Sequence, residues 1–208
     1  MIKKSHTQFG FTLVELLVVI VIIGILVGIT FTGGSYLLSA QEEKQAKSQI
    51  EALSLALDQY KSEKGTYPNT KKMFPNAGDE IGRSSFLLNA LAGLVEQNGE
   101  LLDPDDRGKS FLPGDSITLG KQDGKRNVIV SLGEEEWNGD SIIEAFVMDP
   151  WFTPYIYEYP RLDGHNGYLL FSKGSDGKAS EFGEVLTETP KKESIDEDNI
   201  PSSEPGKW

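Results

Sequence analysis

The clearest pattern in the sequence is a long apolar run that continues into a one-sided helical pattern. Residues 11–32 are apolar at nearly every position. A helix of that length would be roughly 33 Å long, enough to cross a bilayer core of about 30 Å. Farther on, apolar residues recur every three or four positions, the spacing of one helix face: Ala46, Ile50, Leu53, Leu57 and Tyr60. We therefore predict one helix over about residues 12–63, apolar all round in its first half and amphipathic in its second.

Glycine and proline mark the boundaries of this helix. Gly33-Gly34 lies at the junction of the two halves, where a pair of glycines weakens or bends a helix. Lys64-Gly65 is a typical helix end, because glycine readily adopts the left-handed cap conformation. Tyr67-Pro68 then interrupts the pattern. We expect the amphipathic half to span residues 33–64.

The rest of the chain predicts short elements separated by Gly, Asp and Pro. Residues 85–95 have the spacing of a short helix, and residues 127–132 have the composition of a strand. Residues 155–159 and 167–172 predict two aromatic-rich strands, joined by a hairpin loop over 161–166. Together these elements predict an α+β fold, in which a long N-terminal α-helix packs on a small antiparallel β-sheet with the aromatic side chains in the core.

Composition and charge narrow the function. The 38% of hydrophobic residues averages an apolar helix with a polar remainder, and the formal net charge is −12. Nucleic-acid binding is disfavoured because it depends on clusters of Lys and Arg, whereas an acidic body is compatible with a cation site. The chain has no cysteine, and its two histidines are His6 and His165. Disulfides, cysteine nucleophiles and multi-histidine metal centres are therefore excluded.

The N-terminal segment has the features of an exported chain that stays in the membrane. Lys3 and Lys4 precede the apolar run, which by the positive-inside rule keeps the first residues in the cytoplasm and the rest outside. Glu15 interrupts the run, and a carboxylate within a membrane requires a partner or a function. An ordinary secretory signal peptide is the alternative. Its apolar stretch is shorter, however, and the candidate cleavage site ending at Ala40 has the large Leu38 where a small residue is needed.

The residues around Glu15 carry a resemblance to a known family. Gly10-Phe11-Thr12-Leu13-Val14-Glu15, between a short basic leader and an apolar span, resembles the signal of type IV pilins and pseudopilins. The resemblance implies that a prepilin peptidase cleaves between Gly10 and Phe11, that the new amine of Phe11 is N-methylated, and that the span remains in the membrane. It also implies an assembly role for Glu15, whose carboxylate would pair with the Phe11 amine of a neighbouring subunit.

A second block, near the C-terminus, resembles the major pseudopilin of type II secretion. One part of the match is Asp149, Pro150, Trp151, Pro154, Tyr155 and Tyr157, with Phe152 where the family usually has glycine. The other part is a glycine-rich turn: Ser172, Gly174, Asp176 and Gly177. The acidic tail of the family has its counterpart in Asp198-Asn199-Ile200 and Trp208.

This second resemblance implies a calcium site. Calcium takes six to eight oxygen ligands. Asp176 and Asp198 would supply carboxylates, Asn199 an amide oxygen, and Lys173 and Lys178 backbone carbonyls. Residues 181–208 hold eight acids and three lysines, a net charge of −5, so a bound cation would hold an otherwise self-repelling tail on the sheet.

Two other apparent motifs fail. Asp103, Asp105 and Gly108 match positions 1, 3 and 6 of an EF-hand loop, but Gly114 stands where glutamate is required. Gly108-Lys109-Ser110 resembles the end of a phosphate-binding loop, but Asp103 stands where its first glycine belongs. We interpret both as surface turns and His165 as a turn residue. With no nucleophile motif, metal triad or nucleotide loop, we expect neither an enzyme nor an organic cofactor.

The two resemblances together predict a structural pseudopilin of a type II secretion system. It would be a single-pass protein of the bacterial inner membrane with a periplasmic C-terminal domain. Its partners would be copies of itself and other pseudopilins in a filament, the prepilin peptidase, and indirectly the inner-membrane platform and the ATPase. The alternatives are a type IV or competence pilin, or a membrane-anchored periplasmic binding module for a sugar or a protein. The chain is expected to divide into five parts. These are a cleaved leader (1–10), a transmembrane half-helix (11–32), an amphipathic half-helix (33–64), a variable αβ region (65–148) and a sheet with a calcium-type loop (149–208).

Overall fold

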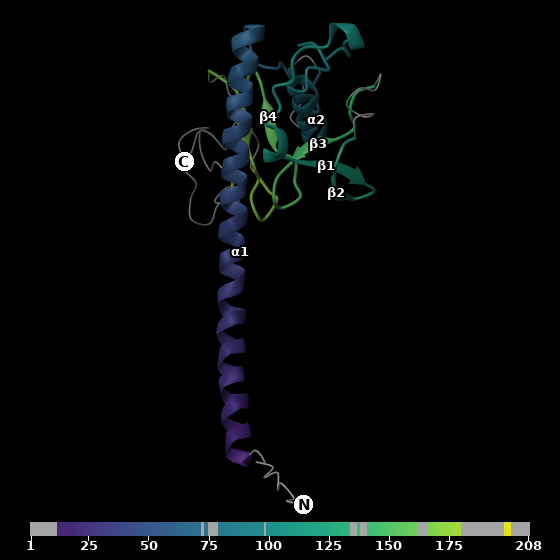
Figure 1. The fold of residues 1–208 in the computed structure, drawn as a ribbon. Coiled ribbons are helices and arrows are strands. Elements are labelled where there is room, and N and C mark those ends of the chain that lie inside the picture. Colours follow the sequence, from purple (N-terminus) through teal and green to yellow (C-terminus); the bar gives the residue numbers. More distant parts are fainter. Residues whose placement is uncertain are drawn as a thin grey trace, which may run out of the picture. The chain divides into compact units, whose positions relative to one another are not determined.

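A computed structural model gives the fold, which separates into two compact units, Met1–Gln41 and Glu42–Trp208 (Figure 1). The described residues are 12–71, 73–74, 79–97, 99–133, 137, 141–161, 166–179 and 198–200.

The long N-terminal helix is confirmed. Helix α1 runs over Leu13–Lys64, and its backbone is helical through Gly33-Gly34. Gly65 ends it as predicted, with a φ of 82° and its N–H donating to the Lys61 carbonyl at 2.8 Å. The same helix therefore contributes residues to both compact units.

In the first unit, the apolar side chains from Leu13 to Val27 are exposed on all sides of α1. Within the described part of the chain, no helix combines the length and the hydropathy needed to cross a bilayer. Phe11 and the side chains of residues 29–32, which belong to the predicted span of 11–32, lie outside the described residues.

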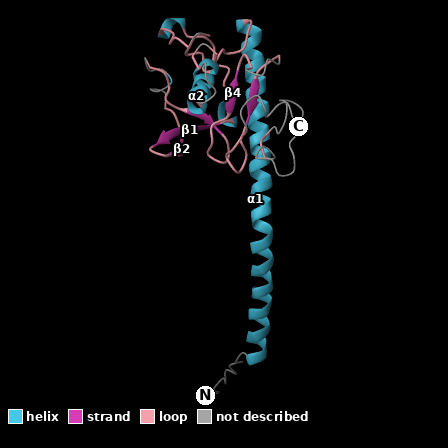
Figure 2. Ribbon diagram, turned by 180° about the vertical axis from the view of Figure 1, so that it is seen from behind, coloured by secondary structure: helices cyan, strands magenta, loops and turns pink. Residues whose placement is uncertain are grey.

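In the second unit, the core forms on the predicted stripe of α1. The five side chains of the stripe are all between 0% and 2% exposed: Ala46, Ile50, Leu53, Leu57 and Tyr60. They belong to one apolar cluster with Leu87 and Leu91 and with the inward-facing aromatic rings of Tyr155 and Tyr157. The predicted aromatic core is thus confirmed at these positions. Figures 1 and 2 show strand β4 (Ile156–Glu158) between this part of α1 and helix α2.

Helix α2 spans Glu80–Leu91, so the predicted range of 85–95 was wrong at both ends. Asp79 caps the first turn by accepting a hydrogen bond from the Gly82 N–H at 2.8 Å. The first turn lacks an apolar stripe because its inward residues include Arg83 and Ser84, which are buried but polar. Gly93, at a φ of 76°, lies in the turn after the helix.

Two small antiparallel sheets complete the α+β fold. Strands β1 (Thr118–Asp123), β2 (Arg126–Val130) and β3 (Phe146–Met148) form one sheet in the order β2-β1-β3. Strands β4 and β5 (Leu169–Phe171) form the other, with Tyr157 opposite Leu170. Short 3-10 helices, η1 and η2, cover Pro104–Asp106 and Gly114–Ser116.

Three predicted strands are confirmed with shifted ends, whereas β1 and β3 were not predicted. Strand β1 lacks the alternation of a half-buried strand, since its last three residues are all exposed. Gly120 within β1 leaves room for the neighbouring strand, because a Cβ there would lie 2.6 Å from the Met148 sulfur. Strand β3 is only three residues long and fully buried, so it shows no alternation either. The central residues 162–165 of the predicted hairpin loop lie outside the described residues.

A buried ion pair joins α2 to the second sheet. The guanidinium of Arg83 donates to the carboxylate of Glu158 at 2.9 Å, and their side chains are 1% and 2% exposed. A second N–H of Arg83 donates to the backbone carbonyl of Phe74 at 2.9 Å. This buried pair links α2 directly to β4.

Candidate functional site

The first turn of α1 holds Glu15 in a capping box. The Thr12 N–H and the Thr12 hydroxyl both donate to Glu15 Oε2 at 2.8 Å, and the Glu15 N–H donates to Thr12 Oγ1 at 3.3 Å. This reciprocal pairing satisfies backbone N–H groups that a helix start leaves without helical partners. The structure therefore fixes the Glu15 carboxylate at the very beginning of the helix. Gly10 and Phe11, where cleavage and methylation are predicted, lie outside the described residues.

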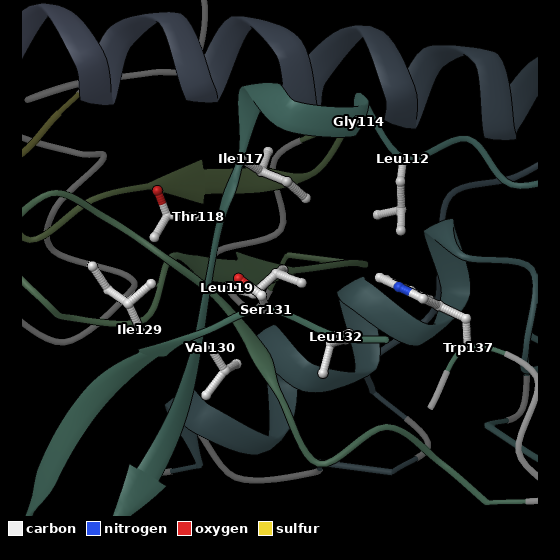
Figure 3. A pocket seen from close by; sticks show the side chains of 10 residues that line it. All are labelled: Leu112, Gly114, Ile117, Thr118, Leu119, Ile129, Val130, Ser131, Leu132 and Trp137. Carbon is white, nitrogen blue, oxygen red and sulfur yellow. The ribbon is translucent and has the colours of Figure 1, made fainter. Parts of the chain in front are cut away.

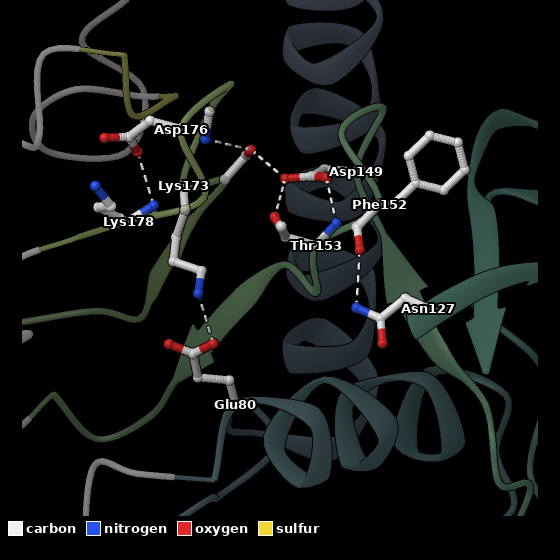
Figure 4. A network of polar contacts seen from close by, with 10 residues as sticks. Glu80, Asn127, Asp149, Phe152, Thr153, Lys173, Asp176 and Lys178 are labelled. Carbon is white, nitrogen blue, oxygen red and sulfur yellow. Dashed lines mark hydrogen bonds and ion pairs between the residues drawn. The ribbon is translucent and has the colours of Figure 1, made fainter. Parts of the chain in front are cut away.

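A second polar centre surrounds Asp149, at the end of β3 (Figure 4). Asp149 is 1% exposed. Its Oδ1 accepts the N–H groups of Trp151 at 3.0 Å and Thr153 at 2.8 Å, which closes a tight turn. Its Oδ2 accepts the hydroxyls of Thr153 at 2.6 Å and Ser172 at 2.5 Å. One buried carboxylate thus joins the turn after β3 to the residue after β5.

The glycine-rich turn lies next to Ser172. The Gly174 N–H donates to Ser172 Oγ at 3.0 Å, and the Lys178 N–H donates to Asp176 Oδ1 at 2.7 Å. Gly174 has a φ of 67°, and a Cβ on it would overlap the backbone carbonyl of Asp198. Glycine is therefore required here both by the backbone conformation and by the close approach of the tail.

The tail residues 198–200 close on this turn. Asp198 Oδ2 accepts the Ser175 hydroxyl at 2.9 Å and the Asp176 N–H at 2.8 Å. Ile200 pairs with Ser172 as an antiparallel bridge, its N–H donating to the Ser172 carbonyl at 2.8 Å. The structure thus brings together Asp176 and Asp198, two of the predicted calcium ligands, and places the 2% exposed Asn199 between the tail contacts.

Lys173 and Lys178, the two predicted backbone ligands, lie at the two ends of the turn and make different contacts. The ammonium of Lys173 pairs with Glu80 of α2 at 2.7 Å, a contact that the sequence did not suggest (Figure 4). Lys178 directs its backbone N–H toward Asp176. Trp208, in the predicted tail motif, lies outside the described residues.

The donors at this turn are carboxylate, amide and backbone oxygens, which are the hard ligands that calcium prefers. Among the described residues, no group of three or more His, Cys, Asp or Glu side chains is arranged to hold a metal ion. Of the described oxygens, Asp198 Oδ2 and Asp176 Oδ1 already accept hydrogen bonds from the turn. A calcium ion here would therefore take most of its ligands from backbone carbonyls and water, with Asp176 and Asp198 as the charged ligands.

Sequence reasoning missed the role of Asp149, although it identified the residue by resemblance. Burial raises the pKa of Asp149, and the hydrogen bonds from Ser172, Thr153 and Trp151 only partly offset this effect. The sequence feature that marks this role is Asp149-Pro150, since an aspartate before a proline favours the start of a turn, and in the structure this is an Asx turn. The partner across the fold, Ser172, is 23 positions away.

The raised pKa of Asp149 gives a prediction about pH. A folded-state pKa above the unfolded value means that the native state binds the proton more tightly. The contribution of Asp149 to stability is then complete below its ordinary pKa of 3.8 and is lost as the pH rises through the folded value. Denaturant unfolding from pH 3.5 to 7 should therefore show the stability of the wild type falling relative to Asp149→Asn as the pH increases. A difference that grows in favour of the wild type with pH would contradict the prediction.

Phe152 stands where the family usually has glycine, and it adopts the left-handed backbone conformation that glycine favours. It has a φ of 66° and is 51% exposed. Its carbonyl accepts a hydrogen bond from the side chain of Asn127 on β2 at 2.8 Å (Figure 4). A phenylalanine in this left-handed region is strained, since its Cβ crowds the following carbonyl. The Asn127 contact and the Asp149 turn hold it there.

A pocket of about 530 Å³ lies on another part of the head, beside the β1–β2 hairpin (Figure 3). Its lining consists of apolar side chains with two hydroxyls and one glycine: Leu112, Gly114, Ile117, Thr118, Leu119, Ile129, Val130, Ser131, Leu132 and Trp137. None of these side chains is an acid, a base or a histidine, so this lining provides no acid–base chemistry.

Comparisons with known proteins match both resemblances. Residues 5–31 match the family model of the prokaryotic N-terminal methylation motif, and residues 123–187 match that of type II secretion system (T2SS) protein G. The chain is similar to type II secretion system core protein G of Escherichia coli K12, with 38% identity over 176 residues, 85% of this chain and 88% of that protein. It is 27% identical over 175 residues to the protein of the same name from Pseudomonas aeruginosa, covering 84% and 89% of the two chains. A type IV major pilin protein, PilA of Myxococcus xanthus, is 30% identical over about half of each chain. No solved structure matches the chain significantly.

Proposed function

The chain belongs to the type II secretion system core protein G family and is a pseudopilin subunit of type II secretion, and we propose that α1 assembles it with copies of itself and with other pseudopilins into a filament. One observation carries this proposal. All thirteen large apolar side chains between Leu13 and Val27 are exposed in the single chain, although the stripe from Ala46 to Tyr60 is covered by the head. Such a surface requires lipid or neighbouring helices around it.

We propose that the subunit is held in the bacterial inner membrane by its N-terminal segment, with the head in the periplasm. Lys3 and Lys4 favour the cytoplasmic side for the first residues, and the match to the N-terminal methylation motif supports processing of that segment. Prepilin peptidase would cleave between Gly10 and Phe11, after which the Phe11 amine is methylated. The family is a structural one, and we propose that this chain acts without catalysis. An inner-membrane platform and a separate ATPase would drive filament growth.

Cross-linking of the full chain tests the filament proposal. Because the chain has no cysteine, a pair of introduced cysteines reports contacts without background. Cells expressing subunits with Val18→Cys and Leu26→Cys should give oxidation-dependent ladders of cross-linked copies. Ala56→Cys is the matched control, since Ala56 lies on the same helix but is 1% exposed within the head. Monomers alone from the Val18→Cys, Leu26→Cys chain, in cells where the leader is removed, would contradict assembly through α1.

We further propose that the turn at residues 174–177 and the tail at 198–200 bind calcium. The support is the pairing of Asp176 with Asp198 across this turn, together with the hard oxygen donors around it. When bound, calcium would supply positive charge that offsets the repulsion between the two carboxylates and the rest of the acidic tail. Asp176 and Asp198 would hold it, with the Asn199 amide oxygen and the backbone carbonyls of Lys173 and Lys178 as further ligands.

Thermal unfolding of the detergent-solubilised full chain tests the calcium proposal. Calcium at about 100 times its Kd stabilises a folded protein by about 2.7 kcal/mol. For a chain of this size the melting temperature should then rise by roughly 5–10 °C. The rise should vanish in Asp176→Asn and in Asp198→Asn and persist in Asp123→Asn, an exposed acid on the β1–β2 hairpin. No rise in the wild type at millimolar calcium would overturn the proposal.

A further inference from the structure

We infer that Asp149 is a positioning residue for the C-terminal segment, because through Ser172 it orients the turn on which Asp198 and Ile200 close. The inference rests on hydrogen bonds within the head and is independent of calcium and of filament assembly. In addition to closing its own local turn, the buried carboxylate of Asp149 orients the turn at residues 174–177.

The two carboxylate oxygens of Asp149 accept hydrogen bonds from different parts of the head. Within the described part of the chain, Oδ1 accepts only backbone N–H groups of its own turn, those of Trp151 and Thr153. Oδ2 accepts two hydroxyls, one local from Thr153 and one from Ser172 at the end of the other sheet. The described donors to Asp149 are all neutral, so the buried charge is held by directed hydrogen bonds alone.

The hydrogen bond to Asp149 fixes the direction of the Ser172 hydroxyl. Because Oδ2 is a carboxylate oxygen and donates nothing, the Ser172 hydrogen must point toward Asp149. The lone pairs of Ser172 Oγ then face away from Asp149 and accept the Gly174 N–H at 3.0 Å. An asparagine at position 149 with its amide nitrogen toward Ser172 would reverse this direction, and the Ser172 hydrogen would lose its acceptor.

The turn at residues 174–177 and the tail at residues 198–200 are in tight contact. Gly174 approaches the Asp198 backbone so closely that even a methyl group on it would collide. Asp198 in turn accepts the Asp176 N–H, and Ile200 bridges to the backbone of Ser172. A small rotation of the turn about Ser172 therefore displaces all the described tail contacts together.

Trp151 extends these contacts to α1. The indole N–H of Trp151 donates to Glu42 Oε2 at 3.1 Å, and the backbone N–H of Trp151 donates to Asp149 Oδ1. Glu42, on the head portion of α1, is thus linked through Trp151, Asp149 and Ser172 to the turn that receives the tail. Asp149 is the residue at which the local turn and this longer connection meet.

Two matched substitutions in the full chain separate positioning from simple stability. Ser172→Ala and Thr153→Val each remove one hydroxyl donor to the same oxygen of Asp149, but of the two hydroxyls only that of Ser172 has a described hydrogen bond to the turn. Hydrogen exchange in EDTA should be about tenfold faster in Ser172→Ala at the amides of Gly174, Asp176 and Ile200, as expected for one lost buried hydrogen bond. Thr153→Val should leave these amides within about threefold of the wild type. The Tyr155 amide, which donates to Val147, reports the integrity of the core in both.

Asp149→Asn provides the second, independent variant. It should speed exchange at the same three tail amides while the amides of Trp151 and Thr153, bound to the other oxygen, stay protected. Equal effects of Ser172→Ala and Thr153→Val on the tail would overturn the inference, as would wild-type protection of the tail in Asp149→Asn. A variant with fast exchange at Tyr155 has lost its fold, and the remaining folded variant then decides.

Discussion

Glu15→Gln is expected to abolish filament assembly while leaving the start of α1 intact. Glutamine at the third helical position still completes a capping box with Thr12, so the local hydrogen bonds persist. A neutral amide, however, cannot pair with the cationic amine of Phe11 in a neighbouring subunit. When Glu15→Gln is introduced into the Val18→Cys, Leu26→Cys chain, the oxidation-dependent ladders on an immunoblot should fall below detection.

Two measurements make this result specific. Leader removal, followed as a shift in mobility on a denaturing gel, should remain complete in Glu15→Gln, since the cleavage site is unchanged. Glu43→Gln is the matched control, an exposed acid on the same helix that pairs with Lys47, and it should assemble like the wild type. Normal amounts of filament from Glu15→Gln would show that the carboxylate serves only as a helix cap.

Removing either partner of the buried ion pair is expected to have the largest effect on stability. Arg83→Met or Glu158→Leu alone leaves one buried charge without its counter-ion, which typically costs about 3–5 kcal/mol. For a protein of this size the melting temperature should fall by roughly 6–20 °C. Thermal unfolding by circular dichroism of the detergent-solubilised chain measures the change.

The double variant tests the physical reason. Arg83→Met with Glu158→Leu removes both charges, and an apolar pair of similar volume is often as stable as a buried salt bridge. The double variant should therefore melt above either single variant. Lys121→Met is the surface control, because its pair with Glu144 is exposed and such pairs contribute about 0–1 kcal/mol. A double variant no more stable than the singles would show that an uncompensated buried charge is not the cause of the loss.

Periodicity predicted well the elements that are long or half-buried. The stripe from Ala46 to Tyr60 was found because one face of α1 packs on the head and the other faces water. Strands β4 and β5 were found from their aromatic residues. The end of α1 was found because Gly65 is needed for its left-handed conformation.

The elements that were missed lack that contrast between faces. Strand β3 is buried throughout, and the outer half of β1 is exposed throughout, so neither alternates. The first turn of α2 faces the core with Arg83, whose charge is compensated by Glu158, 75 positions later. No local pattern reveals such a partner, because it depends on how α2 and β4 pack.

The residues of the candidate site were likewise only partly predictable from the local sequence. Asp176 and Asp198 were located by resemblance, and the structure brings them together at one turn. The part played by Ser172 was not visible, since its two hydroxyl contacts join residues before β4 and after β5. Phe152 was noted as unusual, but its left-handed backbone became apparent only with the Asn127 contact.

The boundary between the two compact units has a consequence for recombination among relatives. It falls after Gln41, inside a continuous helix, and the head core begins only five residues later at Ala46. Tyr155 also donates its hydroxyl to Gln49 of α1 at 2.7 Å. A chimera joined after Lys64 would therefore give the head a foreign set of core residues, whereas a crossover near Gln41 exchanges the N-terminal segment and keeps the described core residues of the head, from Ala46 onward, in place.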